Sequence, residues 1–293
     1  MIVAIVDIGS NSARLLVASV GDDDGVTQLR RERHYLRLGD DVHRLGLIGP
    51  GKLKEAGRVA KRFARIARKS GAEHVETIVT APGRQASNGG DLVAVLTEAT
   101  QAPVIVLSGD EEGRLAWEGA VARMEGPPEV VAVVDLGGGS CELAVGTPKH
   151  GVAWVRSVDA GALRVTRAYL RGNDPTRIAA ARGEISRLVA VFEPPRPDVA
   201  LVVGGTARAI ARIVGRRLSV DRLEGLVGEL AGVPAEMLAA PHGITRERAH
   251  TLLGGTLVLA ATARRLATDL EVGRGGLREG AALALARAAA AAA

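Results

Sequence analysis

Residues 3–17 have the sequence VAIVDIGSNSARLLV, and residues 131–145, at an offset of 128, have the sequence VAVVDLGGGSCELAV. The two stretches are identical at eight of fifteen positions. In each, an apolar β-branched run that is typical of a buried strand ends at an aspartate, and a Gly/Ser turn and a second apolar strand follow. Two copies with one long period indicate duplicated domains and not a solenoid. The sequence therefore predicts two related domains, each beginning with a strand–turn–strand unit.

Strand and helix patterns alternate after both copies. In the first half, strands are expected at 75–80 and 103–107, and helices at 53–69, 91–99 and 111–124. In the second half, strands are expected at 152–158 and 199–203, helices across 164–191 and at 206–214, and loops at 172–175 and 193–197. This alternation predicts an α/β fold with mixed sheets that are flanked by helices.

The segment Glu-Gly-Pro-Pro at 125–128 is the best candidate for a domain boundary, because Gly-Pro and Pro-Pro pairs interrupt regular structure. We therefore expect an N-terminal domain over 1–124 and a C-terminal domain over 125–293. The alanine-rich end, 277–293, is strongly helical and can pack back on the first domain.

The composition is that of an ordinary soluble globular protein. The 293 residues carry a formal net charge of +5, and 47% are hydrophobic and 24% charged. A single cysteine, Cys141, excludes an internal disulfide framework and a zinc site built from cysteines. The histidines are scattered without an HExxH motif, and no window approaches the ~20 uncharged apolar residues of a membrane span. We expect a cytoplasmic protein that binds no membrane.

The positive charge raises the question of an anionic partner. Nucleic acid is not expected, because aromatic residues make up only 2% of the chain and stacking platforms for single strands are nearly absent. The basic residues between Arg58 and Lys69 accompany an apolar stripe of Val59, Phe63 and Ile66, which predicts a solvated helix face and not a binding patch. Mild positive charge still favours anionic ligands in general, including phosphates.

The Asp-x-Gly-x-x-Ser turns at 7–12 and 135–140 predict a phosphate site. Each turn offers consecutive backbone N–H groups and a hydroxyl, which suit a phosphate oxygen. Two such turns that face each other across a cleft would hold one phosphoryl group, and Asp7 and Asp135 would share a Mg²⁺ ion or another divalent cation. The alternative is that each aspartate only caps its turn. The duplication favours the functional interpretation.

Two adjacent acids, Glu111 and Glu112, are separated by helix geometry. Ser108 and Glu111 match the S-x-x-E capping box, which gives Glu111 a local structural role. Glu112 instead shares its face with small and apolar residues, where a carboxylate is costly unless it has a function. It is a candidate general base or water-orienting acid. The alternative is that it pairs with a buried arginine.

Two further segments carry weaker phosphate signals. The sequence VVGGTA at 202–207 predicts a strand that runs into a helix with Thr206 as the N-cap. This arrangement suits an anion, although it is often only a tight turn. Arg84 follows a strand in a turn-rich segment, where an arginine either forms a bidentate phosphate contact or remains a solvated loop side chain.

Four motifs resemble the Ppx/GppA family of exopolyphosphatases and guanosine pentaphosphate phosphohydrolases. They are DIGSNSARL at 7–15, SGDEE at 108–112, DLGGGSCEL at 135–143 and GLREG at 276–280. They occur in the family's order and span most of the chain. The resemblance implies two duplicated ribonuclease H/actin-like domains with a cleft between them, in the short two-domain form of the family. A homodimer would be consistent with it.

The resemblance also implies roles for single residues. Glu112 matches the catalytic glutamate, and Asp135 matches an acid beside the metal and the attacking water. Together with the turns, this predicts a site with Glu112 and Asp135 as catalytic residues, with Asp7, Asp135 and Glu142 as metal ligands, and with Gly9, Ser10, Asn11, Ser12, Arg84, Gly137, Gly138, Gly139, Ser140, Gly204, Gly205 and Thr206 as phosphate-binding residues. The chain departs from the family pattern at Ala81, Pro82, Gln85 and His250.

These features predict metal-assisted hydrolysis of a terminal phosphoanhydride, with Mg²⁺ or another divalent cation as the cofactor. The favoured substrate is inorganic polyphosphate, from which the enzyme would release orthophosphate. Two alternatives stay open, a pppGpp phosphohydrolase and a regulator that binds alarmone or polyphosphate with little turnover. A kinase fits less well, because no separate acceptor site is evident.

Overall fold

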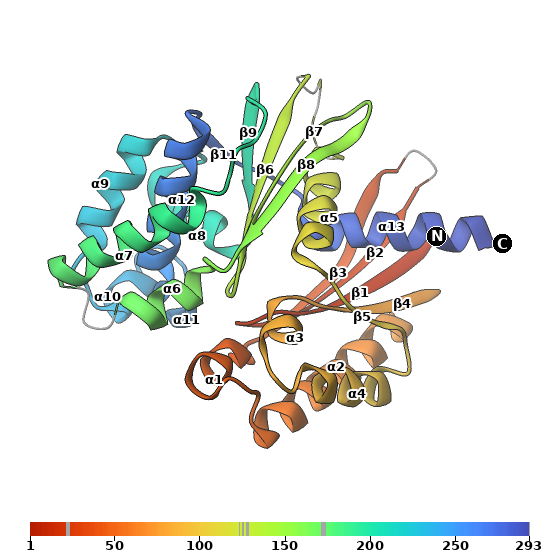
Figure 1. Cartoon of the computed structure of the whole chain (residues 1–293). Helices are drawn as coiled ribbons and strands as arrows, with labels where there is room; N and C mark the ends of the chain where they lie inside the picture. Colours follow the sequence, from red (N-terminus) through yellow and green to blue (C-terminus); the bar gives the residue numbers. More distant parts are fainter. Residues whose placement is uncertain (22–23, 123, 125, 127–128, 171–173, 293) are drawn as a thin grey trace. The chain divides into compact units, whose positions relative to one another are not determined.

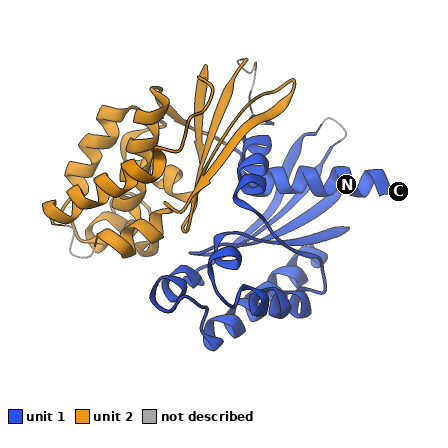
Figure 2. Ribbon diagram, viewed as in Figure 1, with its two compact units in different colours: residues 1–123, 275–293 blue, residues 124–274 orange. Residues whose placement is uncertain are grey.

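The computed structural model describes the chain except for residues 22–23, 123, 125, 127–128, 171–173 and 293 (Figure 1). The described residues form two compact units (Figure 2). Unit 1 comprises residues 1–123 and 275–293, and unit 2 comprises residues 124–274. The predicted boundary at 125–128 and the predicted loop at 172–175 fall mostly on residues outside the described part of the chain.

Unit 1 is built on a five-stranded mixed sheet with the order β3-β2-β1-β4-β5. Its strands are β1 (Ile2–Ile8), β2 (Ala13–Val20), β3 (Val26–His34), β4 (His74–Val79) and β5 (Val104–Val106). Its helices are α1 (Leu38–Leu45), α2 (Pro50–Lys69), α3 (Ala81–Gln85), α4 (Gly89–Thr100), α5 (Gly109–Val121) and α13 (Leu277–Ala292). Strand β1 pairs antiparallel with β2 and parallel with β4, so the carboxyl ends of β1, β4 and β5 lie at one edge.

Helices cover both faces of this sheet, which explains why β1 is apolar apart from Asp7 and does not alternate. On one face, α2 and α4 pack on Val6 and Ile8 through a core that includes Val59 and Phe63 of α2. On the other face, α13 packs on β1 and on α5 (Figure 1). The backbones of α5 and the start of α13 approach so closely that a Cβ atom at Gly119 would collide with residues 276–280. Residues 275–293 therefore belong to unit 1.

Unit 2 contains a six-stranded mixed sheet with the order β10-β11-β9-β6-β7-β8. Its strands are β6 (Val131–Leu136), β7 (Cys141–Thr147), β8 (Gly151–Val158), β9 (Val199–Val203), β10 (Arg217–Leu218) and β11 (Leu270–Val272). Its helices are α6 (Ala162–Tyr169), α7 (Pro175–Val189), α8 (Gly205–Val214), α9 (Val220–Leu230), α10 (Ala235–Ala239), α11 (Arg246–Ala249) and α12 (Leu252–Leu266). Helix α12 is almost wholly buried at the centre of the helical layer.

The two units confirm the predicted duplication. Strands β1, β2, β3 and β4 correspond in order and direction to β6, β7, β8 and β9. The strand expected at 199–203 has the predicted bounds, and the helix expected from 53 begins earlier, at Pro50. Proline is accepted in a first helical turn, where its missing N–H would have had no partner. No helix within the described residues has both the length and the apolar character that a membrane crossing requires.

Candidate active site

The first predicted turn joins β1 to β2 in unit 1. The N–H of Gly9 donates to the carbonyl of Ser12 at 3.2 Å, and the carbonyl of Ser10 accepts from the N–H of Gly39 at 2.8 Å. These bonds hold the turn in one shape. Among the described residues, the N–H groups of Ser10 and Asn11 donate to no other protein group. The turn therefore has the free donors that a phosphate oxygen needs.

Asp7 lies on β1 just before this turn, among charged neighbours. Arg14 on β2 is its direct cross-strand partner. Burial raises the pKa of the Asp7 carboxyl above its usual 3.8, the positive charges of Arg278 and Arg14 oppose that rise, and the negative charge of Glu279 adds to it. The desolvation effect is the largest of these. Asp7 is thus a poorly hydrated carboxylate, and the nearby arginines partly offset the effect of burial on its pKa.

Glu112 lies in the first turn of α5 and is only 4% exposed, which confirms its predicted inward direction. The predicted capping box is also confirmed, since Ser108 and Glu111 form both of its hydrogen bonds. An Nη atom of Arg84 donates to Oε2 of Glu112 at 3.0 Å and to the carbonyl of Leu107 at 2.6 Å. The buried-arginine alternative is therefore realised as well, with Arg84 as the partner.

Three segments of unit 1 meet at one edge of its sheet. The turn at 9–12 follows β1, α3 with Arg84 follows β4, and α5 with Glu112 follows β5. Because these strands are parallel, their carboxyl ends share one edge, where α/β proteins bind ligands. Arg84 is part of helix α3 and not of a solvated loop, so its contact with Glu112 positions both side chains.

The second turn joins β6 to β7 in unit 2 and repeats the first. The N–H of Gly137 donates to the carbonyl of Ser140 at 3.1 Å, and the carbonyls of Gly137 and Gly138 accept from the first turn of α6. A Cβ atom at Gly161, the N-cap of α6, would collide with Gly138. The start of α6 therefore supports this turn closely.

Two acids lie side by side at the second turn. Asp135 on β6 is directly opposite Glu142 on β7, and they are 8% and 0% exposed. The hydroxyl of Ser157 donates to Oε1 of Glu142 at 2.7 Å. Like charges directly opposite each other on paired strands are unfavourable. A bound divalent cation would relieve this repulsion, and carboxylate oxygens are the ligands that Mg²⁺ prefers.

The third predicted phosphate segment lies beside Asp135. Gly204 follows β9, has a φ of +100°, and is the N-cap of α8. A Cβ atom there would lie 2.8 Å from the carbonyl oxygen of Leu136 and 3.2 Å from a carboxylate oxygen of Asp135. Glycine is therefore required both by the backbone conformation and by the close approach.

One sequence interpretation needs correction, and another stays a prediction. Thr206 is not the N-cap of α8, because Gly204 holds that position; Thr206 is fully buried, and its hydroxyl accepts a hydrogen bond from Arg248 at 2.8 Å. Of the three acids proposed as metal ligands, Asp7 belongs to unit 1, and Asp135 and Glu142 belong to unit 2; their joint metal site stays a prediction. In the part of the chain that is described, no group of three or more His, Cys, Asp or Glu residues is arranged to hold a metal. Within unit 2, the candidate metal ligands are the paired carboxylates of Asp135 and Glu142.

The start of α13 was not among the predicted site residues. Its Arg278 acts on the charge of Asp7, and its Glu279 is 5% exposed and pairs with Arg31 of β3 at 2.8 Å. The signal for this placement was present, because both residues belong to the GLREG motif at 276–280. The motif itself does not show which strand the helix contacts.

Comparisons with known proteins identify the family of this chain. Residues 16–288 match the profile of the Ppx/GppA phosphatase family. The chain belongs to the Ppx/GppA phosphatase family. Among curated Ppx/GppA relatives, Exopolyphosphatase 1 of Mycobacterium leprae is 30% identical over 300 residues, which cover 96% of this chain and 88% of that protein. Exopolyphosphatase 2 of Mycobacterium tuberculosis is 28% identical over 290 residues, 90% of each chain.

Solved Ppx/GppA structures share the fold. An exopolyphosphatase-like protein superposes with a TM-score of 0.90 at 24% identity and covers 99% of this chain and 98% of its own. The Aquifex aeolicus family member has a TM-score of 0.83 at 23% identity, with the same coverage. The fold is thus that of a Ppx/GppA protein with two actin-like domains, as the motifs implied.

Proposed function

We propose that this Ppx/GppA protein is an exopolyphosphatase that releases terminal orthophosphate from inorganic polyphosphate. The observation that carries the proposal is Glu112, a buried carboxylate that Arg84 holds at the same sheet edge as the phosphate-suited turn at 9–12. The relatives named above are exopolyphosphatases, and this favours polyphosphate over the pppGpp alternative.

In the proposed reaction, Glu112 orients a water molecule in line with the terminal phosphorus and takes its proton as the new P–O bond forms. The bond between that phosphorus and the bridging oxygen breaks, and the shortened chain leaves with the bridging oxygen. Backbone N–H groups of the turn at 9–12 donate to the phosphate oxygens, which stabilises the charge of the transition state.

Asp135 and Glu142 would hold a divalent cation, with Mg²⁺ as the favoured identity. Such an ion neutralises phosphate oxygens and lowers the pKa of a bound water. The two protein carboxylates leave most of the coordination shell to water and phosphate oxygens, as is usual for Mg²⁺. Arg84 has a positioning role in this scheme, because its bond to Glu112 fixes the direction of the carboxylate.

The test is phosphate release from long polyphosphate, short polyphosphate, pppGpp and ATP, with wild type beside Glu112→Gln. Glutamine keeps an oxygen that accepts from Arg84, so the fold should survive, while the base is lost. We expect kcat on polyphosphate to fall about 10²- to 10⁴-fold. Glu111→Gln is the matched control, since this neighbouring acid serves the capping box, and its kcat should change by less than about twofold.

Three outcomes would contradict the proposal. Normal turnover by folded Glu112→Gln would show that Glu112 is not the base. A clear preference of the wild type for pppGpp would establish the alternative activity. Release from none of the substrates, together with tight binding in calorimetry, would make the protein a regulator that binds its ligand without turnover.

A further inference from the structure

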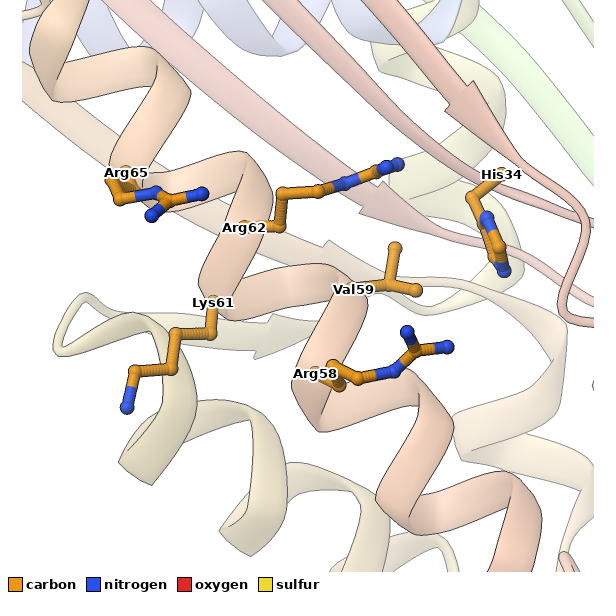
Figure 3. A pocket seen from close by; sticks show the side chains of 6 residues that line it. All are labelled: His34, Arg58, Val59, Lys61, Arg62 and Arg65. Atoms are coloured by element: carbon orange, nitrogen blue, oxygen red, sulfur yellow. The ribbon is translucent and has the colours of Figure 1, made fainter.

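A basic groove lies in unit 1 between α2 and the end of β3. Its His34 end adjoins the sheet edge of the turn at 9–12, because His34 pairs with Ala13 and Ala13 pairs with Ile8, and from there the groove follows α2. Its cavity is about 330 Å³ and is lined by His34, Arg58, Val59, Lys61, Arg62 and Arg65. In Figure 3, Arg58 and Arg62 extend from α2 toward the strand side where His34 lies, while Lys61 points away. None of these residues belongs to the candidate active site. The groove is therefore a separate feature that needs its own explanation.

The positive charge of the groove is not neutralised by the protein. Among the described residues, no carboxylate forms an ion pair with Arg58, Lys61, Arg62 or Arg65. Glu55, one turn before Arg58 on α2, and Glu32 on β3 are already engaged. Glu55 contacts His34 at 3.0 Å and Lys52 at 3.6 Å, and Glu32 pairs with Arg30 at 2.9 Å. Four cations thus face solvent around one cavity, which creates a strongly positive local potential.

Helix geometry makes a row of these charges. Arg58, Arg62 and Arg65 are spaced at i, i+4 and i+7, so they follow one face of α2 over about 10 Å. A single orthophosphate would meet only part of such a row, whereas an extended anion would contact several guanidinium groups at once. Guanidinium groups donate in a planar fork that suits phosphate oxygens. The arrangement therefore fits a chain of phosphates better than an isolated one.

The chemistry of the lining also discriminates among polyanions. Binding of single-stranded nucleic acid normally adds stacking of bases on aromatic side chains to the contacts with phosphates. The lining residues include no Phe, Tyr or Trp, and the neighbouring Phe63 is fully buried in the core. The groove thus supplies charge and directional donors without a stacking surface. This favours an inorganic polyanion over nucleic acid.

We propose that the basic groove is a second binding site for inorganic polyphosphate, where a distal part of the chain docks while its end is hydrolysed elsewhere. The proposal rests on the proposed exopolyphosphatase function, which supplies the ligand. It is an alternative to the expectation that this face of α2 is only solvated. The groove lengthens the time that a long polyphosphate stays bound. It has no role for a polyphosphate that is too short to reach it.

The test is direct binding of long-chain polyphosphate and of tripolyphosphate by the full chain in EDTA, so that no metal-assisted turnover interferes. Wild type is compared with R58Q/R62Q/R65Q and with the control K69Q/K149Q/R196Q. The control removes the same charge from exposed residues that do not line the groove. Each exposed contact contributes little, so we expect the groove variant to bind long chains about tenfold more weakly. As the salt concentration rises, binding of long chains by the wild type should also weaken more steeply than binding by the groove variant.

The two proposals fail in different ways. If both triple variants bind long-chain polyphosphate equally more weakly than the wild type, or if neither binds it more weakly, the groove is not the binding site. Either result leaves the proposed hydrolysis of polyphosphate intact. Groove-dependent binding of long chains without any phosphate release would support the groove and contradict the exopolyphosphatase. Oligothymidylate of matched phosphate number is the third probe. If it binds as tightly and through the same arginines, the groove is a nucleic-acid site and the proposal is wrong.

Discussion

The two Asp-x-Gly-x-x-Ser turns have the same strand–turn–strand backbone but differ in the residue opposite the aspartate. In unit 1, Asp7 is directly opposite Arg14. At the equivalent position in unit 2, 128 residues later, Asp135 is directly opposite Glu142. One acid therefore has a cation as its cross-strand neighbour, and the other has a second acid. Duplication preserved the strand–turn–strand geometry, while a change of charge gave the two turns different chemistry.

The difference suggests separate tasks for the two turns. A pair of buried acids attracts a divalent cation, so the turn of unit 2 suits the metal. The carboxylate of Asp7 has its charge partly offset by Arg14 and Arg278, and the free N–H groups of Ser10 and Asn11 favour phosphate oxygens there.

Among changes that compare the two turns, the largest effect should come from exchanging the acid that distinguishes unit 2. Glu142→Gln keeps the acceptor for Ser157 but removes one of the two carboxylates. We expect the divalent cation concentration for half-maximal activity to rise up to about 100-fold. Arg14→Gln, at the equivalent position in unit 1, is the matched control and should leave that concentration unchanged. A similar shift in both variants would break the distinction between the turns.

A second prediction concerns the support of the turn in unit 2. Gly204→Ala places a Cβ atom against Leu136 at a φ of +100°, and it should lower the free energy of unfolding by about 1–3 kcal/mol. Gly215→Ala is the control, since φ there is +88° and no atom lies within 4 Å of the new Cβ. The strained backbone conformation alone should lower the free energy of unfolding by about 1 kcal/mol, the low end of that range. Urea denaturation measures both, and equal losses would show that only the backbone conformation matters.

The smallest effect is a pH dependence of stability from Asp7. Its pKa is raised in the native state, so above pH 3.8 the native state binds more of this proton than the unfolded chain does. Its contribution to stability is therefore complete at lower pH and is lost as the pH rises through the native pKa. Asp7→Asn does not titrate and so does not lose this stability. Between about pH 4.5 and pH 7.5 its free energy of unfolding should therefore rise relative to that of the wild type, by at most about 1 kcal/mol. Thermal unfolding at both values measures it, and a gain that shrinks with rising pH would contradict the sign.

Local patterns were sufficient to predict several parts of the site. The 3.6-residue period separated Glu111 from Glu112, and the structure confirms both the capping box and the buried carboxylate. Periodicity identified the face but not the partner, because Arg84 is 28 residues away from Glu112 along the chain. Thr206 was misassigned for a similar reason. A Thr after Gly-Gly is a good N-cap candidate, yet the positive φ of Gly204 and the buried Arg248 decided otherwise.

The sequence by itself determined the duplicated α/β architecture and the family, because strand alternation, Gly turns and apolar runs act over a few residues and repeat at a fixed offset. Tertiary structure alone decided which charges meet. It brought α13 from the far end of the chain to Asp7, paired Arg84 with Glu112, and arranged the cations of α2 around a cavity. Such contacts depend on how elements pack, and electrostatic energy depends on distances in space that spacing along the chain does not specify.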